Sequence, residues 1–131
     1  MPDPALRQAL ATGDFIAAPG VYDLISALIA DRMGFKALYV TGYGTVASSL
    51  GLPDAGLATY SEMLDRIARI VAMTKTPVIA DADTGYGGLL NVRHTVRGYE
   101  KAGVTAIQLD RKSGSAGMPR PIVKSRMPSS A

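Results

Sequence analysis

The feature that most constrains the fold is a regular alternation between β-type and α-type sequence along the chain. Short apolar runs rich in β-branched residues are followed by stretches in which apolar residues recur at helical spacing. The alternation repeats four times, at intervals of about 20 to 40 residues. This order is typical of βαβ units, so we expect an α/β fold built on a parallel sheet.

Capping residues and glycines mark the ends of the predicted elements. Thr59 and Glu62 form a capping box at the start of one helix, Asn91 can cap another, and Gly103 stands where that helix should stop. The glycines and proline of residues 42–56 predict a loop. We predict strands at Phe15–Ala18, Ala37–Thr41, Pro77–Ala82 and Thr105–Asp110, and helices from Leu24 to Gly34, from Tyr60 to Thr74 and from Asn91 to Ala102.

Four βα units are half of an eight-fold (β/α)8 barrel, or most of a small open sheet, and periodicity alone does not choose between them. After Asp110 the alternation stops, because the last 21 residues include three prolines and five serines but no aromatic residue. We therefore expect residues 1–110 to form one domain and residues 111–131 to form an irregular, disordered or poorly packed tail.

Composition removes several classes of protein. The chain has no cysteine, which excludes a disulfide framework, a thiolate metal site and a thiol nucleophile. His94 is the single histidine, so a Ser-His-Asp triad or a histidine-rich metal site is not expected within this chain. No apolar run approaches the roughly 20 residues needed to cross a bilayer, and the amino terminus lacks a signal-peptide pattern. We expect a cytoplasmic protein without a membrane partner.

The net charge of +3 comes from the tail rather than from the body of the chain. Residues 1–110 hold 9 Lys and Arg against 11 Asp and Glu, whereas residues 111–131 hold five basic residues and no acid. A mildly acidic body does not offer the basic surface that nucleic acids require. We therefore expect no nucleic-acid partner.

Two aspartates end the third predicted strand, in the sequence PVIADADTGYGG. Asp81 and Asp83 are two residues apart, so strand alternation would place both carboxylates on one face, about 7 Å apart. Such a pair suits a hard divalent ion such as Mg²⁺. The alternative is that one aspartate caps the following turn while the other faces solvent. Asp110, at the end of the next strand, favours the metal site because it adds a carboxylate to the same edge.

The glycine-rich stretch after the second predicted strand suggests a weaker alternative, a dinucleotide-binding domain. Gly42, Gly44 and Ala47 fit the pattern G-x-G-x-x-A, and Glu62 follows twenty residues after the first glycine. That motif needs a helix at the second glycine and an acid at the end of a second strand. Here the prediction is a loop, and Glu62 lies at the start of an amphipathic helix.

Three stretches together resemble one enzyme superfamily. LYVTGYGTVASSLGLPDAG, ADADTGYGG and GYEKAGVTAIQLD are similar to sequences of the isocitrate lyase and phosphoenolpyruvate mutase superfamily, and the resemblance covers roughly residues 15–110. It implies the amino-terminal half of a (β/α)8 TIM barrel. It also implies a carbon–carbon lyase or decarboxylase that binds Mg²⁺, with Mn²⁺ as an alternative, and acts on small 2-hydroxy or 2-oxo carboxylic acids through a metal-held pyruvate enolate. For full-length members, the resemblance implies homo-oligomers.

The resemblance also implies roles for individual residues. Asp81 would bind the metal, Asp83 would hold it directly or through water, and Asp110 falls where the superfamily usually has glutamate. Asp54 matches an aspartate of the active site and is the candidate catalytic residue. The substrate's carboxylate and keto oxygen would be received by Tyr39, Thr41, Gly42, Tyr43 and Gly44.

The departures from the superfamily leave a second function open. The lyase branch carries a mobile loop with a catalytic cysteine, which this chain does not have, and the second half of the barrel is also missing. We therefore expect a truncated member whose ending, from about Arg111, comes from a shifted reading frame or an alternative splice. The alternative function is a catalytically inactive fragment that binds metal or associates with full-length subunits.

Overall fold

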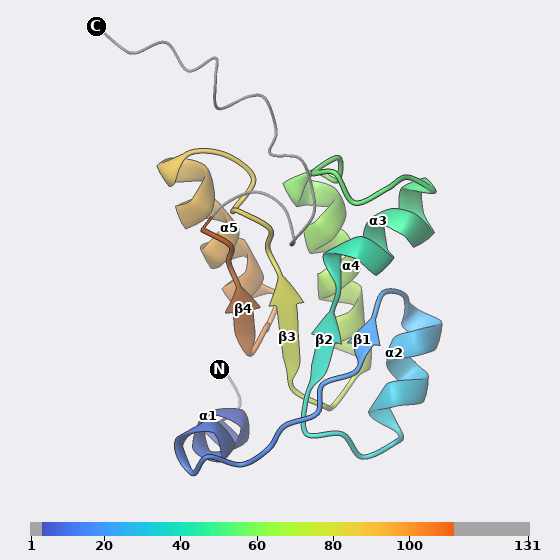
Figure 1. Cartoon of the computed structure of the whole chain (residues 1–131), viewed down its shortest axis with the longest axis vertical. Helices are drawn as coiled ribbons and strands as arrows, with labels where there is room; N and C mark the ends of the chain where they lie inside the picture. The colour runs from blue at the N-terminus through green and yellow to red at the C-terminus, as the bar shows by residue number, and fades with distance from the viewer. Residues whose placement is uncertain (1–3, 112–131) are drawn as a thin grey trace, which may run out of the picture.

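The computed structural model describes residues 4–111, which form a parallel four-stranded sheet with helices packed mainly on one face (Figure 1). The strands pair in chain order, β1-β2-β3-β4, and every pairing is parallel. Each crossover therefore advances the chain by one strand, as it does in the wall of a βα barrel. The strands are β1 (Gly20–Val21), β2 (Leu38–Val40), β3 (Val78–Asp81) and β4 (Ala106–Gln108).

The helices divide between the outer face of the sheet and its two ends. Side chains from α2, α4 and α5 join the strands in the hydrophobic core, whereas α3 follows directly from the carboxyl end of β2. In Figure 1, α1 lies at the opposite end of the sheet, near the amino ends of the strands. The helices are α1 (Pro4–Ala11), α2 (Leu24–Asp31), α3 (Gly42–Leu50), α4 (Tyr60–Met73) and α5 (Leu89–Lys101).

The sheet alternates between a face that the helices cover and an open inner face. Leu38 and Val40 of β2, like Val78 and Ala80 of β3, are at most 2% exposed and pack against the helices. Alternate residues of the same strands, including Asp81, point to the other face and are only partly buried. The alternation therefore places Asp81 on the open inner face.

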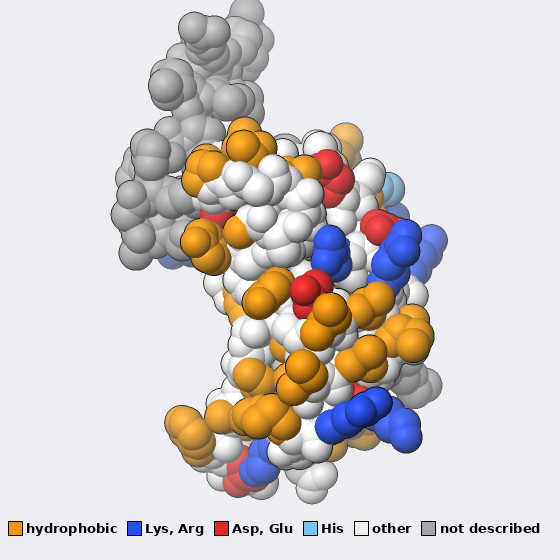
Figure 2. Space-filling model, turned by 90° about the vertical axis from the view of Figure 1, so that its right-hand side faces the viewer, with side chains coloured by type: hydrophobic (Ala, Val, Ile, Leu, Met, Phe, Trp, Pro, Cys, Tyr) orange, Lys and Arg blue, Asp and Glu red, His pale blue; other side chains and the backbone are white. Residues whose placement is uncertain are grey.

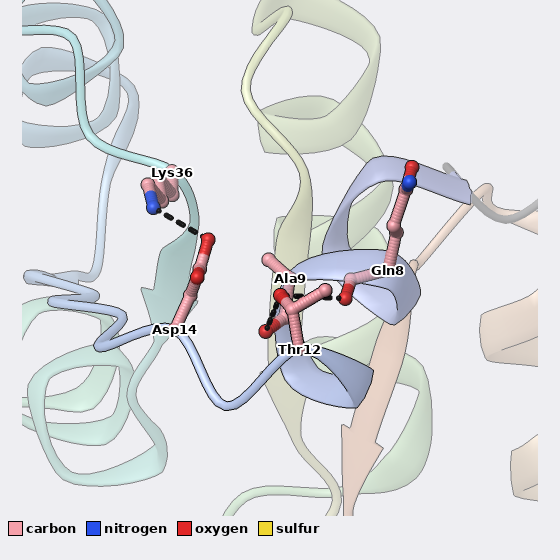
Figure 3. A network of polar contacts seen from close by, with 5 residues as sticks. All are labelled: Gln8, Ala9, Thr12, Asp14 and Lys36. Atoms are coloured by element: carbon pink, nitrogen blue, oxygen red, sulfur yellow. Dashed lines mark hydrogen bonds and ion pairs between the residues drawn. The ribbon is translucent and has the colours of Figure 1, made fainter.

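Helix α1, which the sequence analysis did not predict, precedes a segment that is tied to the sheet by one ion pair. The Asp14 carboxylate lies 3.1 Å from the Lys36 ammonium group, just before β2 (Figure 3). The hydrogen bond and charge of Lys36 hold the pKa of Asp14 below its ordinary value. The Thr12 hydroxyl donates to the Gln8 and Ala9 carbonyl oxygens, at 3.1 and 3.0 Å, and closes the end of the helix.

The predicted first strand, Phe15–Ala18, is wrong in position. Strand β1 begins at Gly20, and Phe15 is 89% exposed. In the register of β1 and β2, Gly20 pairs with Tyr39 and Val21 pairs with Val40. The apolar run therefore leads up to the sheet without joining it.

The predicted loop over residues 42–56 contains α3, so that prediction is also wrong. The helix begins at Gly42 because the Thr41 side chain caps it, accepting the Gly44 N–H at 3.4 Å. It ends at Gly51, whose φ of 64° is the left-handed conformation that a helix C-cap favours. The glycines thus lie at the ends of the helix, where they do not prevent it.

The other predicted helices and strands are found with small shifts of their ends. Thr59 and Glu62 form the expected capping box of α4, and Gly103 ends α5 with a φ of 88°. Asn91 lies inside α5, whose N-cap is Gly88. The predicted tail lies outside the described residues except for Arg111. Among the helices of residues 4–111, none is long and apolar enough to span a membrane.

Candidate metal and substrate site

Acidic side chains gather at the carboxyl ends of the strands. Asp81 ends β3, Asp83 follows in the next turn, Asp110 follows β4, and Asp54 belongs to the segment between α3 and α4. Burial raises the pKa of Asp83, and the negative charges of Asp81, Asp54 and Asp110 raise it further. The four aspartates therefore share one electrostatic environment.

Asp81 is fixed by two backbone donors. Its Oδ1 atom accepts the Asp83 N–H at 2.9 Å, and its Oδ2 atom accepts the Gly42 N–H at 3.2 Å. The second bond depends on the close approach of Gly42, because a Cβ atom there would lie 2.8 Å from Oδ2. The first turn of α3 and the turn after β3 thus hold the Asp81 carboxylate from both sides.

Asp83 lies beside Asp81 because of the turn that follows β3, whereas the prediction placed it there by strand alternation. Strand β3 ends at Asp81, and Asp83 has a φ of 49°, so strand alternation does not set its direction. The turn is closed by the Gly85 N–H, which donates to the Ala82 carbonyl oxygen at 2.8 Å. The left-handed backbone of Asp83 and the hydrogen bond from its N–H to Asp81 bring the two aspartates together. The predicted cause was strand alternation.

Asp110 is joined to this turn through the backbone. Its N–H donates to the Asp83 carbonyl oxygen at 2.7 Å, which ties the end of β4 to the turn after β3. Within residues 4–111, however, no three acidic or histidine side chains are arranged to hold a metal ion by themselves. The donor set fits an ion such as Mg²⁺, which keeps several waters and needs only one or two carboxylates.

Asp54 lies in the segment that passes beside Asp83. Burial and the Asp81 charge raise the pKa of Asp54 above its ordinary value. A Cβ atom on Gly56 would lie 3.9 Å from Asp83 Oδ2, which shows how near the segment runs to the acids. A carboxyl with a raised pKa beside a charged group is a candidate for proton transfer.

The predicted substrate residues fall into two groups. Tyr39 faces the open side of the sheet, where its hydroxyl donates to Gln108 Oε1 at 2.8 Å, and burial with the Asp81 charge raises its pKa. Thr41, Gly42 and Gly44 form the start of α3, next to Asp81. Tyr43 lies in the first turn of the same helix and is 64% exposed.

Tyr86, Thr95, Tyr99 and Gln108 also belong to the surroundings of the site, and the sequence analysis missed them. The Tyr99 hydroxyl donates to the Asp81 carbonyl oxygen at 3.2 Å, and burial raises the pKa of Tyr99 to about 12. The Tyr86 and Tyr99 hydroxyls are also 3.2 Å apart. The signal in the sequence was the spacing of Thr95 and Tyr99, which puts two hydroxyl groups on one face of a helix.

The geometry of the glycine-rich segment does not support the alternative of a dinucleotide-binding domain. A helix does begin at Gly42, contrary to the prediction, but the Gly42 N–H donates to Asp81 at the place where a pyrophosphate would bind. Glu62 Oε2 accepts from the N–H and the hydroxyl of Thr59, both at 2.8 Å, so its role is to cap α4. Glu62, the acid that would have to bind a ribose, is therefore engaged in capping the helix.

The fold and the site together define a parallel βα protein with a group of aspartates at the carboxyl ends of its strands. Its sheet order and acidic edge are those expected for part of a (β/α)8 barrel. The chain belongs to the phosphoenolpyruvate phosphomutase family, which it matches over residues 6–125. The match continues past Asp110, where the resemblance noted in the sequence ended.

Individual relatives of the chain are lyases and related enzymes by name. It is 52% identical over 105 residues to 2,3-dimethylmalate lyase of Eubacterium barkeri, covering 80% of this chain and 36% of the relative. A structure of oxaloacetate acetylhydrolase with its product oxalate is 43% identical, with a TM-score of 0.79, and the likeness covers 83% of this chain and 39% of that one. A structure of phosphonopyruvate hydrolase with oxalate and Mg²⁺ is 32% identical, with a TM-score of 0.80 and coverage of 91% and 40%. The chain therefore spans 36 to 40% of the length of these three relatives.

Proposed function

We propose that this chain supplies the amino-terminal half of the active site of a Mg²⁺-dependent carbon–carbon lyase or decarboxylase. Its substrates would be small 2-hydroxy or 2-oxo carboxylic acids. The observation that carries the proposal is the position of Asp81, whose two carboxylate oxygens are held by backbone N–H groups beside Asp83. The acids lie at the carboxyl ends of parallel strands, where barrel enzymes place their catalytic residues.

Asp81 would bind the metal, Asp83 would hold it directly or through water, and Asp110 would add a carboxylate at the same edge of the sheet. Repulsion among these carboxylates, which contributes to the raised pKa of Asp83, is relieved when a cation binds between them. Mn²⁺ has similar ligand preferences and would be an alternative. When bound, Mg²⁺ supplies Lewis-acid stabilisation of negative charge on a substrate oxygen.

The chain's own residues would bind and orient the substrate and move a proton. The backbone at Thr41, Gly42 and Gly44 opens α3, and the N-terminus of a helix favours a bound carboxylate. The Tyr39 hydroxyl lies on the open face and would donate to the same ligand in place of Gln108 Oε1. Its raised pKa makes Asp54 the candidate for proton transfer near the reacting atoms.

The relatives support the choice of substrate class. Two of the similar structures contain oxalate, a small dicarboxylate, and one of them also contains Mg²⁺. The lyase of Eubacterium barkeri is named for 2,3-dimethylmalate, a 2-hydroxy acid. All of these molecules offer a carboxylate beside a second oxygen, which is the pair of atoms that one hard cation can bind together.

Pyruvate release tests the proposal. We would incubate the purified chain with Mg²⁺ and either oxaloacetate or 2-methylisocitrate, and follow pyruvate in each mixture. Pyruvate release that disappears in an Asp83→Ala variant would support a lyase or decarboxylase. An absence of pyruvate from soluble, folded chain would contradict catalysis by this chain alone.

A second function is favoured by the two open edges of the sheet. Within residues 4–111, β1 and β4 each pair with only one neighbour. The second proposal is a catalytically inactive fragment that binds metal or associates with full-length subunits. Metal binding without pyruvate release, together with co-purification with a full-length relative, would distinguish it from the first.

A further inference from the structure

The buried face of α5 is unusual because both of its buried residues carry hydroxyl groups. Thr95 and Tyr99 are each 0% exposed, and they are the buried residues of this helix. They are four residues apart and so lie on one face, directed toward the sheet. An apolar residue is the ordinary choice for such a position, because a buried hydroxyl costs free energy unless it is hydrogen-bonded.

Both hydroxyl groups donate to backbone carbonyls that flank the pair of aspartates. The Tyr99 hydroxyl donates to the Asp81 carbonyl oxygen at 3.2 Å, at the end of β3. The Thr95 hydroxyl donates to the Gly85 carbonyl oxygen at 3.0 Å, on the far side of the same turn. Helix α5 therefore holds the turn that carries Asp83 at both of its ends.

The turn between these two bonds has a backbone that needs such support. Asp83 lies in this turn and Tyr86 directly follows it; their φ values are 49° and 61°, which residues other than glycine rarely adopt. Conformations of this kind persist only where the surrounding structure holds them. The Tyr86 hydroxyl, 3.2 Å from the Tyr99 hydroxyl, adds a third link between α5 and the turn.

We propose that Thr95 and Tyr99 are positioning residues that set the metal affinity of the Asp81 and Asp83 pair. This inference rests on the proposed metal site, but the hydrogen bonds that it invokes belong to the metal-free chain. Losing either hydroxyl frees one end of the turn. The Asp83 N–H then moves relative to Asp81, and the two carboxylates no longer meet a cation at the right separation.

The test compares hydroxyl-deleting variants that keep the shape of each side chain. Tyr99→Phe and Thr95→Val remove the two hydroxyls, and Thr95→Ser restores the second one in a smaller side chain. The matched controls are Tyr60→Phe, in the same group of aromatic rings, and Thr74→Val, which removes a hydroxyl that donates to the Ile70 carbonyl oxygen of α4. The NMR resonances of the Gly42 and Asp83 amides report the bonds to Asp81, and Mn²⁺ titration reports affinity.

We expect Tyr99→Phe and Thr95→Val each to shift both amide resonances and to weaken Mn²⁺ binding by about tenfold. Thr95→Ser and the two controls should keep the original affinity and resonances. Original resonances and affinity in either hydroxyl-deleting variant would overturn the inference. If the unmodified chain binds no Mn²⁺, the proposed metal site fails, and the resonances alone then decide whether these hydroxyls position the aspartates. If Tyr99→Phe or Thr95→Val fails to fold, the other variant decides the test, because both remove a hydrogen bond to the same turn.

Discussion

At the scale of single residues, the ionised carboxylate of Asp83 destabilises the folded chain. Its pKa is raised from the ordinary value of 3.8 by burial first and then by Asp81, Asp54 and Asp110. Asp83 therefore binds a proton more tightly in the folded chain than in the unfolded chain. The folding free energy that this difference contributes is lost as the pH rises from 3.8 through the pKa of the folded state. A group that destabilises the metal-free fold at neutral pH is typical of a binding site.

We expect Asp83→Asn to stabilise the metal-free chain at neutral pH by up to about 1 kcal/mol, a modest gain because the side chain is partly exposed. Asparagine tolerates the left-handed backbone, so the turn itself should survive. Urea unfolding with and without Mg²⁺ measures the effect, and the gain should vanish at acidic pH. The control is Asp65→Asn, which changes an exposed carboxylate of α4. A loss of stability in the metal-free Asp83→Asn variant would contradict this reasoning.

Gly42 offers a second test at this scale. A Cβ atom there would lie 2.8 Å from Asp81 Oδ2, so Gly42→Ala should displace the carboxylate and cost about 1–3 kcal/mol of folding free energy. Alanine is otherwise the better helix former, so the expected sign is opposite to that from helix propensity. Gly88→Ala is the control, because its Cβ meets nothing within 4 Å. Equal stability and Mn²⁺ affinity in Gly42→Ala and the unmodified chain would show that the contact does not matter.

At the scale of elements, α4 and α5 are in contact because Gly98 leaves room for Tyr60. A Cβ atom at Gly98 would overlap the Tyr60 hydroxyl oxygen, and the Tyr60 ring also packs beside Tyr99, with ring centroids 6.5 Å apart. A glycine inside a helix costs about 1 kcal/mol relative to alanine. This cost is offset because the absence of a Cβ atom at Gly98 allows the two helices to pack closely at this point.

We expect Gly98→Ala to destabilise the chain by about 1–2 kcal/mol, since overpacking exceeds the gain in helix propensity. Tyr60→Phe removes the overlapping oxygen, so the double variant should be more stable than Gly98→Ala alone. Thermal or urea unfolding of the two single variants and the double variant gives the coupling between them. Additive changes would mean that the two residues do not interact.

The elements differ in how far the sequence could predict them. Helix α4 was found because its capping box and its apolar stripe are local signals, and β3 was found because its short apolar run is also a local signal. Helix α3 was missed because glycine at the start of a helix looks the same in sequence as glycine in a loop. The roles of Thr95 and Tyr99 depend on where α5 packs, which no local pattern specifies.

At the scale of the whole molecule, the described chain leaves apolar surface uncovered. Ile25, Ile29 and Met33 are 73%, 59% and 66% exposed on and just after α2. Figure 2 views this side of the molecule, where apolar side chains gather. Within residues 4–111, the edges of β1 and β4 are also unpaired. Open strand edges and apolar patches favour association between chains.

We therefore expect the purified chain to associate, so that its sedimentation coefficient rises with protein concentration. Replacing both isoleucines, Ile25→Lys and Ile29→Lys, should lower this association while circular dichroism keeps its helical signal. The double replacement of the exposed Arg69→Lys and Lys75→Arg, which preserves charge, is the control. A monomer at every concentration of the unmodified chain would contradict the expectation.

Binding of Mn²⁺ to the metal-free chain, measured by the EPR signal of the free ion, tests the central claim most directly. We expect a saturable site that excess Mg²⁺ displaces, that Asp81→Asn and Asp83→Asn abolish, and that Asp65→Asn leaves intact. The absence of a saturable site in the folded chain, or unchanged binding in Asp83→Asn, would contradict the assignment of these two aspartates to a metal.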